Sequence, residues 1–316
     1  MKNINWNKVD KINKLFWDQN IRQFWVDEEI PLSDDKITWN TLIPKEKELF
    51  KKILAGLTLL DSYQGNVGMT NILQYVDSSY EKSVLSYMAF MENMHAKSYS
   101  SIFSTLCTTS EINELFAWSE SCQPLINKVN PILSAYEGIK ESAQLPKALV
   151  YSVFLESFLF YSGFFYPLYL AGHSKLVASN EIINLIIRDE SIHGMYVGLL
   201  FQKYNKNAKH LFLKKAEIYE MLDSLYQLEE KYIELLYVDF PELIPQVKIF
   251  TQYNGNKALM NLGEDPYFKV EESMVNPIVL KGLDTKTKNH DFFSTKGNGY
   301  IKKTNIEHLS DEDFNI

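Results

Sequence analysis

The chain of 316 residues is poor in the residue types that mark several large classes of protein. Only two of its 32 basic residues are arginine, Arg22 and Arg188, which indicates the codon bias of an AT-rich genome. The net charge is -8 and no basic patch stands out, which argues against nucleic-acid binding. The two cysteines, Cys107 and Cys122, match neither a zinc pattern nor a disulfide framework. Residues 1–4 do not begin an apolar signal core.

Long uninterrupted apolar runs are also missing, although hydrophobic residues make up 46% of the chain and allow a large core. The longest apolar stretches are broken by ionisable residues such as Glu156 and Arg188, which argues against a membrane span. The sequence therefore predicts a soluble cytoplasmic protein without a membrane or nucleic-acid partner.

Apolar residues recur at three- and four-residue spacing over most of the chain, a pattern typical of α-helices. Pro44 suits the first turn of a helix, and Thr108 with Glu111 forms a possible capping box. Residues 1–40 mix aromatics with Asp, Asn and Pro, and we expect them to form an irregular arm. The expected helical stretches are residues 49–74, 80–106, 112–118, 148–170, 181–204 and 211–237.

The composition changes near residue 283, which predicts one helical domain over residues 1–283 and a tail over residues 284–316. The tail is first lysine-rich and then acidic, and such a segment cannot bury enough surface to order itself. It is either a frayed end or a partner-binding tail with Phe314 and Ile316 as apolar anchors.

Two short motifs of one pattern, Glu-x-x-His, carry the strongest functional signal. The first joins Glu92 to His95 and the second joins Glu190 to His193, with an offset of 98 residues between corresponding members. Residues three apart lie on one face of a helix, so each Glu and His can point at one ion. Four-helix bundles that hold a pair of metal ions are built from such motifs, each accompanied by a further carboxylate.

An acidic residue precedes each motif within an apolar segment. Asp61 lies 31 residues before Glu92, and Glu156 lies 34 residues before Glu190. Burying such acids is costly, and two divalent cations would balance the four carboxylates. Carboxylate and imidazole ligands suit iron or manganese, while the lack of thiolates argues against a structural zinc site. The sequence therefore predicts a dinuclear manganese or iron site in an all-α bundle.

A tyrosine shares the helical face of the first motif. Tyr99 lies four residues after His95 and seven after Glu92, so its phenol should point toward the metals. A tyrosine on a core-facing stripe is usually a packing residue, but beside an oxidising dimetal centre a phenol can lose an electron and a proton. Apolar residues at helical spacing from the acids of the second half-site should surround this phenol; they are Phe160, Phe164 and Ile186.

With these motifs the chain resembles the small, radical-generating subunit of class I ribonucleotide reductase, and most closely the class Ib form. The resemblance covers nearly the whole length and rests on residues 59–62, 92–100, 155–164 and 188–193. It implies a ferritin-like helical bundle with a dimetal-carboxylate site in its four-helix core and a flexible C-terminal tail.

The resemblance also implies a role for individual residues. One metal would be bound by Asp61, Glu92 and His95, and the other by Glu156, Glu190 and His193. Tyr99 would hold the radical, and the residues that transfer it would be Trp25, Asp189 and Tyr300.

The implied activity is reduction of ribonucleotides to deoxyribonucleotides by a separate large subunit, to which the tail docks. A homodimer is implied, together with a flavodoxin-like activator if the metal is manganese; with iron, dioxygen would suffice. The chain ends with Asp, Phe, Asn and Ile at residues 313–316, where relatives often carry Trp and a terminal Phe. This departure concerns docking to the large subunit rather than the chemistry.

Three other interpretations of the residues remain open. An oxygen-activating dimetal oxidase acting on a lipid or small molecule would share the fold and ligands, but would not need Tyr99 and the long tail. A ferritin-like storage protein would be shorter and would not need Trp25 or Asp189. A purely structural bundle would leave four acids in apolar segments unexplained.

Overall fold

The computed structural model describes residues 3–208 and 211–283, and within these ranges it contains helices and connecting loops but no strand. This confirms the predicted all-α class. The longer helices are α1 (Lys11–Arg22), α3 (Pro44–Tyr63), α5 (Ser79–Leu106), α6 (Thr109–Ser121), α7 (Gln123–Glu137), α8 (Leu145–Phe154), α9 (Tyr161–Gly172), α10 (Val177–Asn207), α11 (Lys215–Leu236) and α12 (Ile244–Leu262). Short helices α2 (Asp35–Trp39), α4 (Thr70–Tyr75) and α13 (Pro277–Leu283) complete the set.

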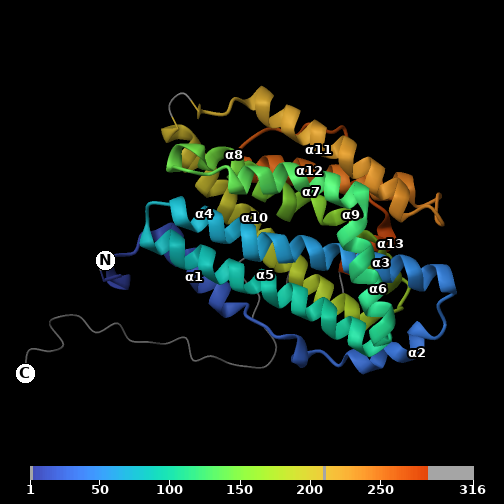
Figure 1. The fold of residues 1–316 in the computed structure, drawn as a ribbon. Coiled ribbons are helices and arrows are strands. Elements are labelled where there is room, and N and C mark those ends of the chain that lie inside the picture. The colour runs from blue at the N-terminus through green and yellow to red at the C-terminus, as the bar shows by residue number, and fades with distance from the viewer. Residues whose placement is uncertain (1–2, 209–210, 284–316) are drawn as a thin grey trace, which may run out of the picture.

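Four helical segments pack around one another at the centre of the bundle (Figure 1). Helix α3 lies against α5, α5 against α10, α10 against α8, and α9 returns to contact α3. These contacts close a ring, because α8 and α9 are consecutive parts of one helical stretch. Side chains that point inward from all four segments therefore meet in one buried space.

Two of these segments contain a π-helical turn. The first, η4 (Gln64–Met69), joins α3 to α4, and the second, η6 (Leu155–Leu159), joins α8 to α9. The predicted stretches 49–74 and 148–170 are helical, but their apolar spacing did not reveal these turns. A π-turn inserts an extra residue, rotates the side chains that follow, and is frequent at functional sites.

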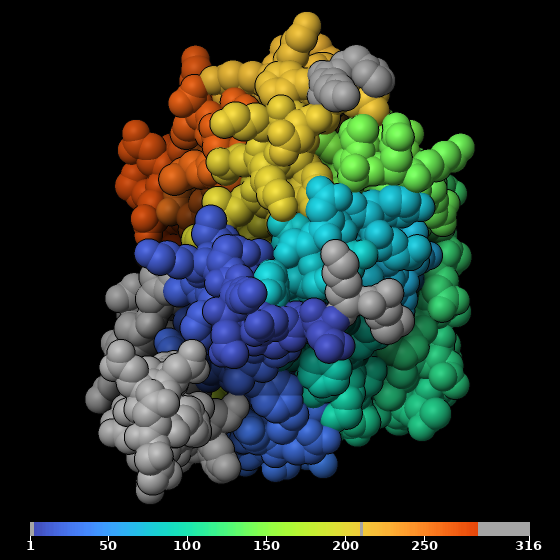
Figure 2. Space-filling model, turned by 90° about the vertical axis from the view of Figure 1, so that its left-hand side faces the viewer, coloured from blue at the N-terminus to red at the C-terminus, as the bar shows by residue number. Residues whose placement is uncertain are grey.

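The expectation of an irregular arm over residues 1–40 is wrong for residues 11–22, which form the regular helix α1. The backbone N–H of Asn13 donates to the Asp10 carboxylate at 3.0 Å, which caps the helix. Helix α1 contacts α5 and α10, and Figure 2 shows this N-terminal segment, in blue, lying over one side of the bundle. Its buried residues are Asn13, Phe16, Gln19 and Asn20. Most of them are polar. Apolar residues do recur at helical spacing in α1, at Ile12, Leu15 and Phe16, but only Phe16 is buried, so the apolar face of this helix is not the face that it buries.

Other helix boundaries follow local capping rules. Pro44 occupies the first turn of α3, and Thr108 caps α6 together with Glu111, as predicted. The stretch predicted from residue 211 is corrected, because α11 begins only at Lys215. The preceding loop is held by Asn205, whose side-chain oxygen accepts from the backbone N–H of Leu213 at 2.8 Å.

The helical stretch Ser142–Gly172 is long and apolar enough to cross a membrane by length and composition alone. Within the bundle, however, 94% of its most apolar window is buried. It also carries Glu156, which is fully buried among the central helices. These are the properties of a core helix of a helical bundle.

Candidate metal centre

Six ligand-type side chains from the four central segments converge in the core. Their donor atoms form two groups, each within 4.8 Å, and all six residues are fully buried. The first group contains Asp61, Glu92, His95 and Glu190, and the second contains Glu92, Glu156, Glu190 and His193. The sequence predicted two separate half-sites, whereas the structure places Glu92 and Glu190 in both groups. A carboxylate in both groups can bridge two ions.

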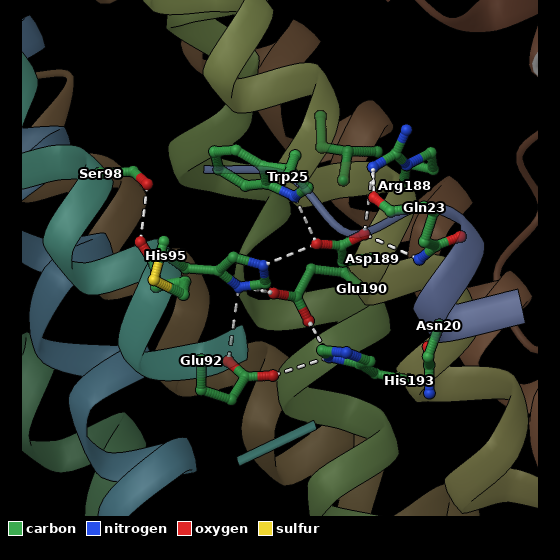
Figure 3. Close-up of polar contacts among 12 residues, drawn as sticks. Asn20, Gln23, Trp25, Glu92, His95, Ser98, Arg188, Asp189, Glu190 and His193 are labelled. Carbon is green, nitrogen blue, oxygen red and sulfur yellow. Dashed lines mark hydrogen bonds and ion pairs between the residues drawn. The ribbon is translucent and has the colours of Figure 1, made fainter. Parts of the chain in front are cut away.

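The donor set fits a pair of cations, because its donor atoms lie close together and most of them have no hydrogen-bond partner among the described residues. His193 Nδ1 lies 2.7 Å from Glu92 Oε1, and His95 Nδ1 lies 3.0 Å from Glu190 Oε1 (Figure 3). The buried ligand atoms that lack a hydrogen-bond partner within the described chain are both oxygens of Asp61, Glu92 and Glu190, Oε2 of Glu156, and Nδ1 of His95 and His193. Such buried polar atoms are costly unless they are satisfied, and metal ions would satisfy them together.

Burial and mutual repulsion shift the protonation of these ligands when no cation is bound. Burial, and then the charge of Glu92, hold the pKa of Asp61 well above its usual value, and the same two causes raise the pKa of Glu190. Although burial opposes it, contact with Glu156 and Glu92 raises the pKa of His193 to about 10. Contact with the two histidines in turn outweighs burial and lowers the pKa of Glu92 to about 2. Without a cation, these shifts favour the protonated forms of Asp61, Glu190 and His193.

A carboxylate outside the cluster supports the first histidine. Asp189 Oδ2 accepts from Trp25 Nε1 at 2.7 Å and lies 3.1 Å from His95 Nε2, while its Oδ1 accepts from Gln23 Nε2 at 2.8 Å (Figure 3). The rings of Trp25 and His95 are nearly parallel, at 16°, with centroids 6.1 Å apart. Burial opposes ionisation of Asp189, but contact with His95 and the charge of Arg188 lower its pKa. An ionised carboxylate therefore links an indole to a candidate metal ligand.

The two histidines are supported differently. His95 has Asp189 beside its outer nitrogen, an arrangement that orients metal-binding histidines in many proteins. The outer nitrogen of His193, Nε2, is buried and has no hydrogen-bond partner within the described ranges. The half-sites therefore differ in their surroundings, although they offer the same ligand types.

Tyr99 lies on α5 with its side chain fully buried. Its hydroxyl has no well-formed hydrogen bond to a described residue. Burial, followed by the charges of Asp61 and Glu190, raises the pKa of this phenol well above its usual value, which places the phenol close to the acidic cluster. The predicted pocket residues Phe160, Phe164 and Ile186 are also fully buried. Their packing around the phenol stays a prediction, and Tyr300 lies outside the described residues.

Comparison with known proteins assigns the chain that carries this buried cluster to one family. The family model of the ribonucleotide reductase small chain matches residues 3–277. The chain belongs to this family. It is 53% identical to the ribonucleoside-diphosphate reductase subunit beta of Bacillus subtilis over 98% of this chain and 95% of that one. It is 42% identical to the ribonucleoside-diphosphate reductase 2 subunit beta of Escherichia coli, over 99% and 98%.

A solved small-chain structure extends this similarity to three dimensions. The dimanganese(II) NrdF protein of Streptococcus sanguinis superimposes with a TM-score of 0.84 at 46% identity, over 90% of this chain and 99% of that chain. The expected ferritin-like fold of the family is thereby confirmed. The buried carboxylate and histidine cluster fits the dinuclear manganese or iron centre that the sequence predicted.

A small cleft reaches the outer side of the second half-site. It has a volume of about 170 Å³ and is flanked by Ser157 and Ser191, the residues directly after Glu156 and Glu190. Tyr161 and Lys257 also line it.

Sequence reasoning missed several polar residues around the ligands. Gln23 donates to Asp189 from the end of the arm, and Gln64 donates to both Ser152 and Glu156 inside the core. One signal for Gln64 was available, because it lies three residues after Asp61 and hence on the same helical face. No local signal marked Gln23, which lies 166 residues from its partner.

Proposed function

We propose that this small chain is the class Ib form of its family and generates a tyrosyl radical on Tyr99 for ribonucleoside-diphosphate reduction by a large subunit. The observation that carries this proposal is the buried link from ligand to indole, in which Asp189 joins His95 to Trp25. A storage protein would not need the tryptophan at the end of this link, and an oxidase would not need Tyr99. The 46% identity to a dimanganese(II) NrdF protein supports the class Ib assignment.

The metal ligands would be the six residues of the cluster, with Glu92 and Glu190 placed to bridge. Once bound, a dinuclear manganese or iron centre supplies the oxidising power needed to remove an electron from a phenol. Tyr99 is suited to be that phenol because it is fully buried, carries its proton, and has carboxylates nearby to receive it. Phe160, Phe164 and Ile186 would exclude water from the phenoxyl radical.

Transfer of the radical out of the core would use Asp189 and Trp25. The short hydrogen bond from the indole N–H to an ionised carboxylate allows the proton to move when the indole loses an electron. The parallel rings of Trp25 and His95 bring the indole next to the metal cluster. Tyr300 would continue the route toward the large subunit, outside the described residues.

Partners follow from the same proposal. The tail, residues 284–316, would dock on the large subunit, and two copies of this chain would form a homodimer. If the metal is manganese, a flavodoxin-like activator would deliver the oxidant, and the cleft beside Ser157 and Ser191 would be its route toward the second half-site. A cytoplasmic location is part of the proposal, and the two free cysteines, Cys107 and Cys122, agree with a reducing compartment.

Tyr99→Phe tests the radical assignment directly. The wild-type chain, loaded with manganese or iron and activated, should show a tyrosyl signal by electron paramagnetic resonance that the variant lacks. Both proteins should bind the same amount of metal. Their stabilities should also agree to within about 1 kcal/mol, because the hydroxyl that is removed has no well-formed hydrogen bond to a described residue.

Tyr237→Phe is the matched control, since Tyr237 is another fully buried tyrosine, and its hydroxyl donates to the backbone oxygen of Ser162 rather than to the metal cluster. It should keep the tyrosyl signal. A radical that persists in Tyr99→Phe and disappears in Tyr237→Phe would contradict the assignment. Deleting residues 300–316 should leave the radical intact and abolish turnover with the large subunit; unchanged turnover would refute docking through the tail.

A further inference from the structure

A fully buried glutamine connects the two halves of the metal centre. Gln64 begins the π-turn η4, three residues after Asp61, and faces η6 across the core. Its Nε2 donates to Glu156 Oε1 in a short contact, and to Ser152 Oγ at 2.9 Å. Its Oε1 accepts from the Tyr136 hydroxyl at 2.6 Å. Each of the four residues in this network is fully buried.

The network determines which end of the amide faces the carboxylate. Burial is the main reason that the pKa of Tyr136 lies well above its usual value, so the phenol keeps its proton and acts as a donor. A donor at Oε1 leaves the Nε2 hydrogens pointing toward Ser152 and Glu156. The phenol thus orients the amide, and the amide holds one oxygen of the candidate ligand.

The backbone at Gly68 packs closely against the side chain of Gln64. A Cβ atom at Gly68, one turn later in η4, would lie 2.4 Å from Gln64 Oε1 and 2.8 Å from Tyr136 Cε2. Only glycine fits this position without displacing the amide. The π-turn therefore brings Gln64 and Gly68 together, and the amide is tightly packed on the side of Gly68.

The two oxygens of Glu156 have different surroundings as a result. Oε1 is taken by Gln64, whereas Oε2 has no hydrogen bond and lies 3.3 Å from His193 Nδ1. Oε2 is therefore the oxygen better placed to bind an ion next to His193. A neutral amide achieves this without adding a fifth carboxylate to the four that two divalent cations would balance.

We propose that Gln64 is a positioning residue that restricts Glu156 to one-oxygen coordination of the second metal ion. The inference rests on the proposed metal site, but not on radical formation at Tyr99. Without the amide, Glu156 would be free to bind through both oxygens or to rotate toward the first ion. The affinity of the second ion and the coupling between the two ions should then change.

The test replaces the amide with a side chain of similar length that cannot donate, Gln64→Met. Manganese(II) is titrated into the metal-free chain, the bound ions are counted, and the spectrum of the dimanganese(II) form is recorded by electron paramagnetic resonance. Removing a partner that orients a ligand typically costs about tenfold to hundredfold in metal affinity, so the second ion should bind more weakly by that factor. The spectrum of the ion pair should also change, because Glu156 coordinates differently.

Gln74→Met is the matched control, since Gln74 is exposed on α4 and donates only to the backbone oxygen of Thr70. It should bind both ions as the wild-type chain does. Tyr136→Phe is a second variant that keeps Gln64 but frees its amide, and we expect a smaller loss in the same direction. It replaces Gln64→Met if that variant does not fold.

The proposal is overturned if Gln64→Met binds the second ion within about twofold of wild type and gives the same spectrum. If Gln64→Met does not fold, unchanged binding and an unchanged spectrum in Tyr136→Phe overturn it. A wild-type chain that binds two ions but forms no tyrosyl radical would refute the proposed function and leave this inference standing. A wild-type chain that binds no pair of ions would refute both.

Discussion

Removing the carboxylate of Asp189 should loosen the link between the metal cluster and Trp25. In Asp189→Ala, the indole N–H of Trp25, the side-chain amide of Gln23 and the outer nitrogen of His95 all lose their shared acceptor. The carboxylate is buried and its pKa is lowered, so these are hydrogen bonds to a charged group. The donors remain in the core, where water cannot replace the lost partner.

The size of the effect follows from these contacts. A hydrogen bond to a charged group contributes about 1.5–3 kcal/mol, so the bonds from Trp25 and Gln23 together contribute about 3–6 kcal/mol. Asp189→Ala also removes the free-energy cost of burying the carboxylate, which offsets part of the loss of these hydrogen bonds. We therefore expect the free energy of unfolding to fall by about 3–5 kcal/mol in Asp189→Ala. Asp189→Asn keeps an acceptor for Trp25 but places an amide N–H opposite the side-chain amide of Gln23. We therefore expect the free energy of unfolding to fall by about 1–2 kcal/mol in Asp189→Asn.

Denaturant unfolding of the metal-free chain measures the stability. Titration with manganese(II) measures the metal affinity, which should be about tenfold to hundredfold weaker in Asp189→Ala. Asp18→Asn is the control, because Asp18 is partly exposed and pairs only with Lys14; it should change stability by less than about 1 kcal/mol. The reasoning is refuted if Asp189→Ala resembles this control in both assays, or if Asp189→Asn is the more damaging change.

Two further predictions concern charge in the core. Metal uptake should release protons and tighten as the pH rises, because the pKa values of Asp61 and Glu190 are raised and that of His193 is raised to about 10, so that a cation must displace protons from these groups; an affinity that is flat or falls with pH would contradict this. Lys128→Met should lower the free energy of unfolding by about 3–5 kcal/mol, because Lys128 Nζ lies 2.8 Å from the Glu229 carboxylate and both are fully buried. The double variant with Glu229→Leu should recover most of that loss in denaturant unfolding, and additive losses would show that the pair does not act as a unit.

Local spacing was sufficient to predict much of the fold and the ligand set. Apolar periodicity predicted the central helices, because each presents one face to the core. The two Glu-x-x-His motifs predicted which side chains share a helical face, since residues three apart always do. Helix α1 was missed although Ile12, Leu15 and Phe16 recur at helical spacing, and the face that it buries is mostly polar.

Which elements meet across the core was decided only by the tertiary structure. Spacing along one helix defines a face but not the partner that this face contacts. Spacing alone therefore assigned Glu92 and Glu190 to separate half-sites. The packing of α5 against α10 instead places both carboxylates in each of the two donor groups. The link from Trp25 to Asp189 spans 164 residues, and the link from Gln64 to Glu156 spans 92 residues and depends on two π-turns. The residues alone thus determined a pair of metal-binding motifs in a helical bundle, while packing decided which carboxylates are shared and which polar groups hold them.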